Sequence, residues 1–117
     1  MRILIIVNDP PYGTEKAYNA LRLAMALQKE HEGASVRMFF MADGVVAALE
    51  GQETPQGYYN LGRMLRSVVK KGGVVALCGS CLDARGLQNA AFVEGCERGS
   101  MSQLASWTME AERVLTF

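Results

Sequence analysis

The chain has 117 residues, of which 50% are hydrophobic, and its 12 basic and 12 acidic residues give a formal net charge of zero. This length and composition suit one domain over residues 1–117 with an ordinary apolar core, and they exclude a disordered chain. The lack of a basic tract excludes an electrostatic nucleic-acid surface, and no apolar run approaches the roughly 20 residues that cross a bilayer. Without a signal-peptide pattern at its start, we expect a cytoplasmic protein with no membrane partner.

The first half of the chain alternates strand and helix patterns. A continuous apolar run over 2–8 predicts a strand buried on both faces, and a proline pair ends it. Residues 14–30 place alanines and leucines at helical spacing, so they predict a helix with Thr14 as its N-cap. The run over 35–41 predicts a second strand, and Asp43 follows at once as the cap of a short helix.

The second half continues the alternation. Residues 58–71 carry an apolar helical stripe, and the run over 74–78 predicts a third buried strand. The motif Ser80-Cys-Leu-Asp83 has the form of a capping box, so we expect a helix to begin at Cys81. A further short helix is predicted over 89–94.

A second capping box, Ser100-Met-Ser-Gln103, opens the last helix, and 113–117 form a final strand. This order favours a single doubly wound α/β domain, with a mainly parallel sheet and helices on both faces. In such a sheet, ligands and reactive groups lie beyond the carboxyl ends of the strands. Segments 8–14, 41–43 and 78–85 are therefore expected to meet there.

Cys78 is the candidate for chemistry because it closes a buried strand and faces the following turn. Gly79 lets backbone amides approach the sulfur, and the amides of Ser80 and Cys81 then lie close by. A helix that begins near Cys81 turns its positive end toward the same place, and Arg85 adds a positive charge. Each feature favours the nucleophilic thiolate, and the same features hold a persulfide anion.

The other cysteines leave alternatives open. Cys81 completes a Cys-x-x-Cys motif with Cys78, so the pair forms a redox-active disulfide or Cys81 resolves a persulfide on Cys78. Free cysteines also often only pack in the core, and Cys96 is expected to do so. A zinc site needs two further ligands, for which the chain offers only Cys96 and His31, so no metal is expected.

Asp9, Tyr12 and Asp43 are candidates to line a pocket at the same sheet edge, although the first two also suit an ordinary turn and Asp43 a helix cap. The sequence lacks a Gly-x-Gly-x-x-Gly motif, a Walker motif and a Ser-His-Asp set. We therefore expect no nucleotide or other cofactor.

Several motifs together resemble the DsrE/DsrF-like family of small sulfur-relay proteins over nearly the whole chain. They are Pro-Tyr-Gly-Thr-Glu at 11–15, Phe-Phe-Met-Ala-Asp-Gly at 39–44, Pro-Gln-Gly-Tyr-Tyr-Asn at 55–60 and Cys-Gly-Ser-Cys-Leu-Asp-Ala-Arg-Gly at 78–86. The last motif lies nearer the functionally unassigned branch of the family than its sulfur-relay branch. The resemblance implies a five-stranded sheet, so one strand is hidden, and we place it within 86–100.

The resemblance also implies a function. In the relay branch the persulfide cysteine precedes an Arg-Gly pair by seven residues, and Cys78 precedes Arg85-Gly86 by this interval. We therefore expect a sulfur carrier or sulfurtransferase that exchanges sulfur with a donor or acceptor protein or a small sulfane-sulfur species, and that assembles as a homotrimer or homohexamer. The alternatives are a thiol–disulfide redox module of Cys78 and Cys81, and a non-enzymatic ligand-binding or assembly module.

Overall fold

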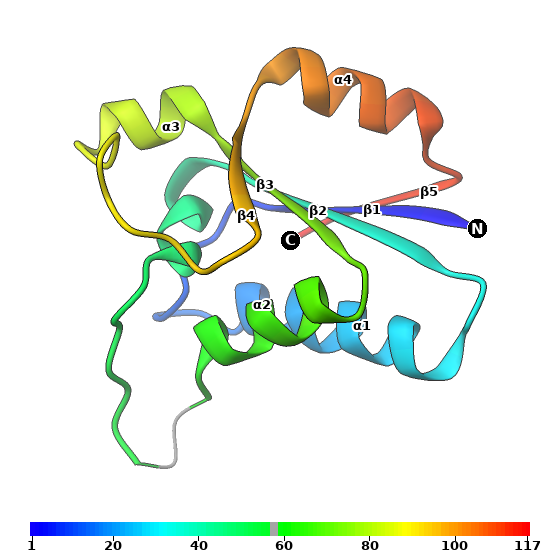
Figure 1. Cartoon of the computed structure of the whole chain (residues 1–117), viewed down its shortest axis with the longest axis horizontal. Coiled ribbons are helices and arrows are strands. Elements are labelled where there is room, and N and C mark those ends of the chain that lie inside the picture. The colour runs from blue at the N-terminus through cyan, green and yellow to red at the C-terminus, as the bar shows by residue number, and fades with distance from the viewer. Residues whose placement is uncertain (57–58) are drawn as a thin grey trace.

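The computed structural model describes residues 1–56 and 59–117, and in these residues the strands form one five-stranded sheet (Figure 1). Every pair of neighbouring strands is parallel, in the order β4-β3-β2-β1-β5. The expected doubly wound α/β fold is thus confirmed, and the hidden strand is β4. The strands are β1 (Arg2–Val7), β2 (Ser35–Phe40), β3 (Val74–Cys78), β4 (Cys96–Gly99) and β5 (Arg113–Thr116).

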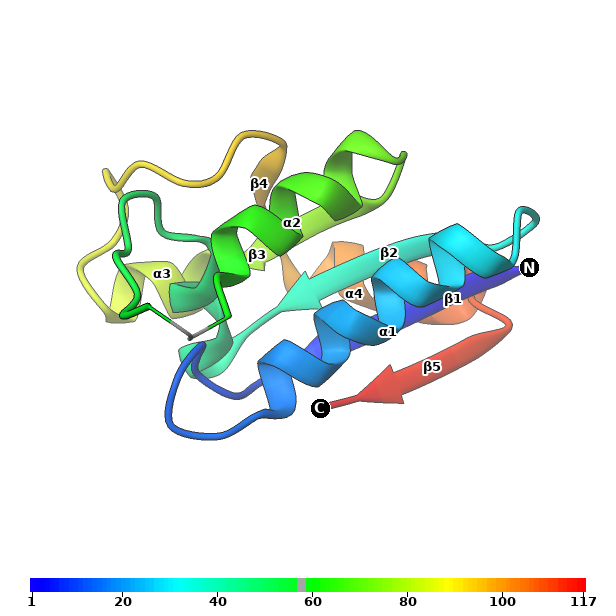
Figure 2. The ribbon, with the colours of Figure 1, turned by 90° about the horizontal axis from the view of Figure 1, so that it is seen from below.

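Helices cover both faces of this sheet (Figures 1 and 2). Helices α1 (Lys16–Glu30) and α2 (Leu61–Lys70) lie on one face, and α3 (Gly79–Ala84) and α4 (Met101–Glu110) lie on the other. A 3₁₀ helix, η1 (Ala42–Ala48), follows β2 directly. Because both faces are covered, the central strands are apolar at nearly every position rather than at alternate ones. Across the described residues, no helix combines the length and apolar character needed to cross a membrane.

Two helix starts in the first half differ from the sequence prediction. Helix α1 has Glu15 at its N-cap, because the Thr14 hydroxyl donates instead to the Asp9 carboxylate at 2.8 Å. That hydroxyl still accepts a hydrogen bond from the Lys16 amide at 3.3 Å. Helix η1 has Met41 at its N-cap, and Asp43 lies inside its first turn. The Asp43 carboxylate is therefore free to bind outside its own helix.

The second half contains two further corrections. The helix predicted from Tyr58, a residue outside the described part of the chain, begins at Leu61, where the Asn60 side chain accepts from the Arg63 amide at 3.0 Å. The short helix predicted over 89–94 does not form in these described residues, which make turns and an isolated bridge between Leu49 and Phe92. Backbone hydrogen bonds to the end of η1 hold this segment extended and outcompete a local helix.

The last helix follows its prediction. The Ser100 hydroxyl accepts from the Gln103 amide at 3.2 Å, as in a capping box, and α4 starts at the next residue. Trp107 then packs edge-on against Phe39 of β2, with ring centroids 6.2 Å apart. The radius of gyration, 13.2 Å, is close to the roughly 13 Å expected of one compact unit of this size.

Candidate functional site

The turn after β3 places two cysteines in one helical turn. We expected a helix from Cys81 with Ser80 as its cap, but α3 begins at Gly79 and Cys78 is its N-cap. Ser80 does not cap because its hydroxyl lies 3.3 Å from the Cys78 Sγ atom instead. Cys78 and Cys81 therefore occupy the N-cap and third positions of α3, whose side chains meet on one side of the helix.

The Cys78 sulfur is nearly sealed, since this residue is only 4% exposed. Burial raises the pKa of the Cys78 thiol, but the Cys81 thiol, the Ser80 hydroxyl and the amides of both residues lower it, and the net pKa lies below its ordinary value. The amides face the sulfur without closing a full capping hydrogen bond. The site thus favours an anionic sulfur, because hydrogen-bond donors stabilise the charged form.

Cys81 has the opposite tendency. Its half-buried Sγ atom accepts a hydrogen bond from the Ala42 amide at 3.1 Å. Burial and the hydrogen bond to Cys78 raise the pKa of the Cys81 thiol, against the lowering effects of the Ala42 amide and the Arg85 charge. The pKa values of the two thiols therefore move in opposite directions, as in a pair of groups that titrate together. Ala42 has a left-handed φ of 51°, which is a costly conformation for a residue other than glycine. In this conformation the Ala42 amide points at the Cys81 sulfur.

Arg85 lies beside Cys81 and brings Asp43 into the site. Its Nε and Nη2 atoms donate to the Asp43 Oδ1 atom at 3.0 and 2.8 Å, and its Nη1 atom donates to the Cys81 carbonyl at 3.0 Å. The contacts join the end of α3 to η1. The guanidinium that we expected near Cys78 thus acts on Cys81 and holds the two segments together.

Arg98 of β4 is a site residue that sequence reasoning missed. Its guanidinium lies against Gly79, where an added Cβ atom would come within 2.7 Å of Nε and 2.8 Å of Cζ. It forms two hydrogen bonds of 2.8 Å with the Asp83 carboxylate, which raise the pKa of Arg98, and the charge of Cys78 acts in the same direction. Only the position of β4 beside β3 reveals this cation, because its neighbour Gly99 pairs with Cys78.

The remaining predicted residues organise the loop after β1. The Asp9 carboxylate accepts a hydrogen bond from the Thr14 hydroxyl, as described above. The Tyr12 hydroxyl donates to the Tyr59 carbonyl and accepts from the Leu61 amide, both at 3.4 Å. These contacts fasten the loop to the start of α2, at the same carboxyl edge of the sheet as Cys78.

Cys96 and metal ligands do not extend the site. Cys96 is 9% exposed, and burial, with a contribution from the Glu50 charge, raises the pKa of its thiol to about 12. All three cysteines lie in the described residues and are free thiols. In the same residues, no group of three or more histidine, cysteine or acidic side chains is arranged to hold a metal ion.

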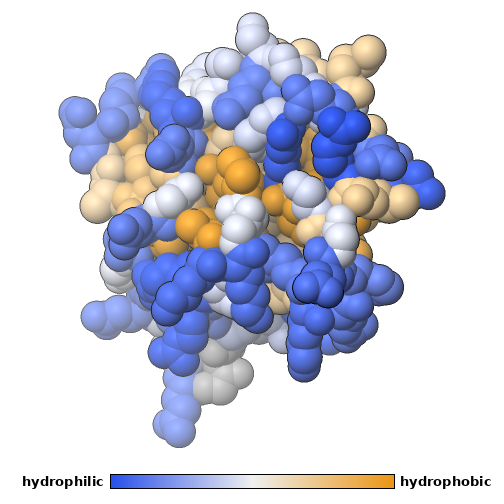
Figure 3. All heavy atoms as spheres, turned by 45° about the vertical axis from the view of Figure 1, so that its right-hand side comes forward, coloured by the Kyte–Doolittle hydropathy of each residue, from blue (hydrophilic) through white to orange (hydrophobic). Residues whose placement is uncertain are grey.

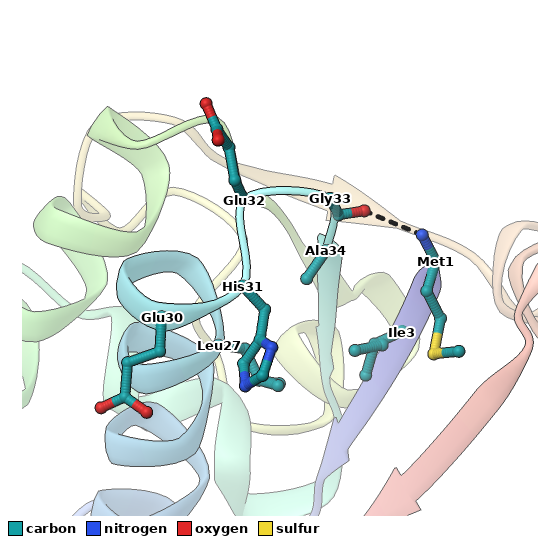
Figure 4. Close-up of a pocket in the computed structure, with 8 residues that line it drawn as sticks. All are labelled: Met1, Ile3, Leu27, Glu30, His31, Glu32, Gly33 and Ala34. Atoms are coloured by element: carbon teal, nitrogen blue, oxygen red, sulfur yellow. Dashed lines mark hydrogen bonds between the residues drawn. The ribbon is translucent and has the colours of Figure 1, made fainter.

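A separate hollow of about 650 Å³ lies at the opposite, amino-terminal edge of the sheet. Figure 4 shows Leu27 and His31 on one side and Met1 and Ile3 on the other, and the Met1 amino group donates to the Gly33 carbonyl at 2.8 Å. Its lining residues carry neither a thiol nor a basic side chain beyond His31. All three cysteines therefore lie outside this hollow.

Comparisons with known proteins agree on one family. The DsrE/DsrF-like family matches residues 1–117. The chain is 40% identical to protein YchN of Escherichia coli over 99% of this chain and 98% of YchN, and the YchN crystal structure superposes with a TM-score of 0.95. It is 32% identical to sulfurtransferase TusD of Salmonella typhi over the full length of both chains. The structure of MTH1491 from Methanobacterium thermoautotrophicum, at 13% identity and a TM-score of 0.80, shares the fold.

Proposed function

The chain belongs to the DsrE/DsrF-like family, and on this premise we propose that it is a sulfur carrier that holds sulfane sulfur as a persulfide on Cys78 and passes it to a partner thiol. The family and the TusD relative support a role of the sulfur-relay kind. The observation that carries the finer proposal is the environment of the Cys78 sulfur. It ends β3 among a hydroxyl, a thiol and two amides, all aimed at an anion.

The chemistry balances without a cofactor. The Cys78 thiolate attacks the outer sulfur of a donor persulfide, R–S–SH, and the S–S bond of the donor breaks. The donor leaves as the thiolate R–S⁻, and Cys78 becomes Cys78–S–SH, which loses a proton to the solvent. Discharge is the same reaction in reverse order, in which an acceptor thiolate attacks the outer sulfur and Cys78 leaves as the thiolate.

The sealed position of Cys78 restricts the donor. Cys78 is 4% exposed, the exposed Ser80 side chain lies beside its sulfur, and the exposed Arg98 side chain lies beside Gly79. A narrow donor group, such as the terminal sulfur of a persulfide or polysulfide, meets this requirement. Arg98 then attracts an anionic donor, because its guanidinium lies against Gly79, the residue that follows Cys78.

Intact mass spectrometry after brief exposure to inorganic polysulfide tests the proposal. Immediately after loading, the wild-type chain and Cys96→Ser are expected to carry added sulfur, and this added mass is expected to be absent in Cys78→Ser. Cys96→Ser is a matched control because it removes a buried thiol of the same chain from outside the site. A Cys78→Ser chain that still gains one sulfur would contradict a carrier role for Cys78.

A thiol–disulfide module is the second candidate, favoured by the placement of Cys78 and Cys81 in one turn of α3. Here the pair cycles between dithiol and disulfide and exchanges electrons rather than sulfur with its partner. Mild oxidation followed by mass spectrometry separates the two roles. A chain that resists disulfide formation at this pair yet accepts sulfur on Cys78 is a carrier alone.

We also propose that copies of the chain associate through β5, the edge strand beside β1. Its four residues are all exposed, including Val114 at 42% and Leu115 at 38%. Figure 3 shows apolar side chains gathered in the middle of one face of the molecule, between charged groups. The exposed apolar side chains of this edge strand and the zero net charge favour self-association, in which further copies of the chain cover these side chains.

Light scattering on the protein as it elutes from a size-exclusion column measures the mass of the assembly. A trimeric or hexameric mass is expected, and Leu115→Lys is expected to lower it. Met101→Lys, which changes a 60% exposed apolar side chain on α4, is the control. A wild-type monomer at micromolar concentration would exclude this interface.

A further inference from the structure

We propose that Cys81 is a built-in resolving thiol, which attacks a persulfide on Cys78 and releases its outer sulfur as hydrosulfide when no acceptor takes it. The inference rests on the proposed carrier role of Cys78 and goes beyond it. It assigns the second cysteine a reaction, and it assigns the chain a second product. A sulfur relay passes sulfane sulfur on unchanged, whereas this step reduces it.

The positions of the two sulfurs carry the argument. Cys78 caps α3 and Cys81 is its third residue, so their side chains meet within one turn. The Ala42 amide donates to the Cys81 Sγ atom at 3.1 Å, and the Ser80 hydroxyl lies 3.3 Å from the Cys78 Sγ atom. Each sulfur thus has its own hydrogen-bond partner, and neither has to cross the fold to reach the other.

The surroundings of Cys81 suit a nucleophile that starts as a thiol. The Cys81 side chain lies within hydrogen-bond reach of Cys78 on the same turn of α3, so its sulfur starts beside the Sγ atom that it attacks. When the proton leaves, the Ala42 amide and the Arg85 guanidinium stabilise the new thiolate. Arg85 is itself fixed by Asp43 and by the Cys81 carbonyl, so this support is in place before the reaction.

The step balances as Cys81–SH plus Cys78–S–S⁻ giving the Cys78–Cys81 disulfide plus HS⁻. The Cys81 sulfur bonds to the Cys78 Sγ atom, and the bond from Sγ to the outer sulfur breaks. The outer sulfur takes the electron pair and the Cys81 proton. The two cysteine sulfurs together lose two electrons in this step. An external dithiol returns them to the reduced state by thiol–disulfide exchange. It attacks the sulfur of half-buried Cys81, which is more accessible than that of Cys78.

The low exposure of Cys78 also favours attack by Cys81 over attack by an external thiol. Cys78 is 4% exposed, so an external thiol approaches its Sγ atom with difficulty, whereas Cys81 is already beside it. A correctly placed internal group has an effective concentration far above that of any dissolved thiol. Persulfide that meets no acceptor is therefore cleared by the chain itself.

The test loads the full chain with inorganic polysulfide, removes the excess on a desalting column without added thiol, and follows two signals. Trapped hydrosulfide is measured against time, and intact mass reports persulfide or disulfide. Wild type and Cys96→Ser are expected to release one hydrosulfide per chain and to end as the disulfide. Cys81→Ser and Cys81→Ala are expected to keep the added sulfur at least about tenfold longer.

The variants separate this inference from the carrier role. A Cys78→Ser chain that takes up sulfur overturns the carrier role itself. If Cys78→Ser stays empty but Cys81→Ser and Cys81→Ala lose sulfur as fast as wild type, the carrier role stands and the resolving role of Cys81 is wrong. Release that slows in proportion to dilution would also overturn it, because a step within one chain does not depend on protein concentration.

Discussion

Two cysteines on neighbouring strands have opposite properties although both are nearly sealed. Cys78 ends β3 at 4% exposure, and Cys96 starts β4 at 9% exposure. Donors around Cys78 hold the pKa of its thiol below the ordinary value, whereas burial in the apolar core and the Glu50 charge raise the pKa of Cys96 to about 12. Burial alone therefore does not decide the direction in which the pKa of a thiol shifts. The decisive feature is the presence of donors, which the carboxyl end of β3 has.

The largest expected contrast is in reaction with iodoacetamide. At pH 8, we expect native Cys96 to react at least about a thousandfold more slowly than Cys78, because its thiolate fraction falls by about tenfold for each unit of raised pKa. Peptide-level mass spectrometry measures both rates in one sample. The same peptides labelled in concentrated urea are the control and are expected to react alike. Equal native rates would remove the contrast.

Stability at alkaline pH gives the next contrast. Because the folded-state pKa of Cys96 lies above its unfolded value, the folded state binds the extra proton between the two, and stability falls as pH rises through that window toward about 12. From pH 8 to 10 the wild type is expected to lose about 1.5 kcal/mol more than Cys96→Ala. Urea unfolding at both pH values gives this difference. Parallel pH profiles would show that Cys96 is not protected in the core.

The Ser80 hydroxyl is the donor to remove next. Ser80→Ala deletes the 3.3 Å contact with Cys78, so we expect the pH midpoint of Cys78 alkylation to rise by about half a unit. Ser100→Ala is the matched control, because it removes the cap of α4 away from the site. It is expected to cost about 1 kcal/mol of stability and to leave the midpoint unchanged. An unchanged midpoint in Ser80→Ala would show that the amides and Cys81 lower the pKa of the Cys78 thiol without the Ser80 hydroxyl.

The smallest expected effect comes from Arg98, which is exposed and already paired with Asp83. Arg98→Met keeps the apolar stem and removes the charge, so the midpoint of Cys78 is expected to rise by a few tenths of a unit. Arg85→Met is the control, since Arg85 acts on Cys81. Alkylation profiles of both variants compare the two cations directly. A larger shift of the Cys78 midpoint in Arg85→Met than in Arg98→Met would show that Arg85 is the cation that acts on Cys78.

Local patterns were sufficient for most of the fold. The apolar runs of β1, β2 and β3 and the capping box at Ser100 depend on residues close together in the chain, so their signals survive without tertiary information. The place of Cys78 at the end of a buried strand follows from the same runs. The predictions that were wrong concern segments with competing partners. Ser80 turns to a sulfur, Thr14 to a carboxylate, and 89–94 to the end of η1.

The chemistry of the site, in contrast, arises from contacts between distant residues. Arg85 pairs with Asp43 across 42 positions, and Ala42 reaches the Cys81 sulfur across 39. Arg98 enters only because a four-residue strand with weak apolar character pairs with β3. Periodicity and capping signals report an element and its buried face, but the pKa of a thiol depends on the donors and charges that lie nearest to it in space. That is why a cysteine could be selected from the sequence, whereas the opposite pKa shifts of Cys78 and Cys81 emerged only from the folded chain.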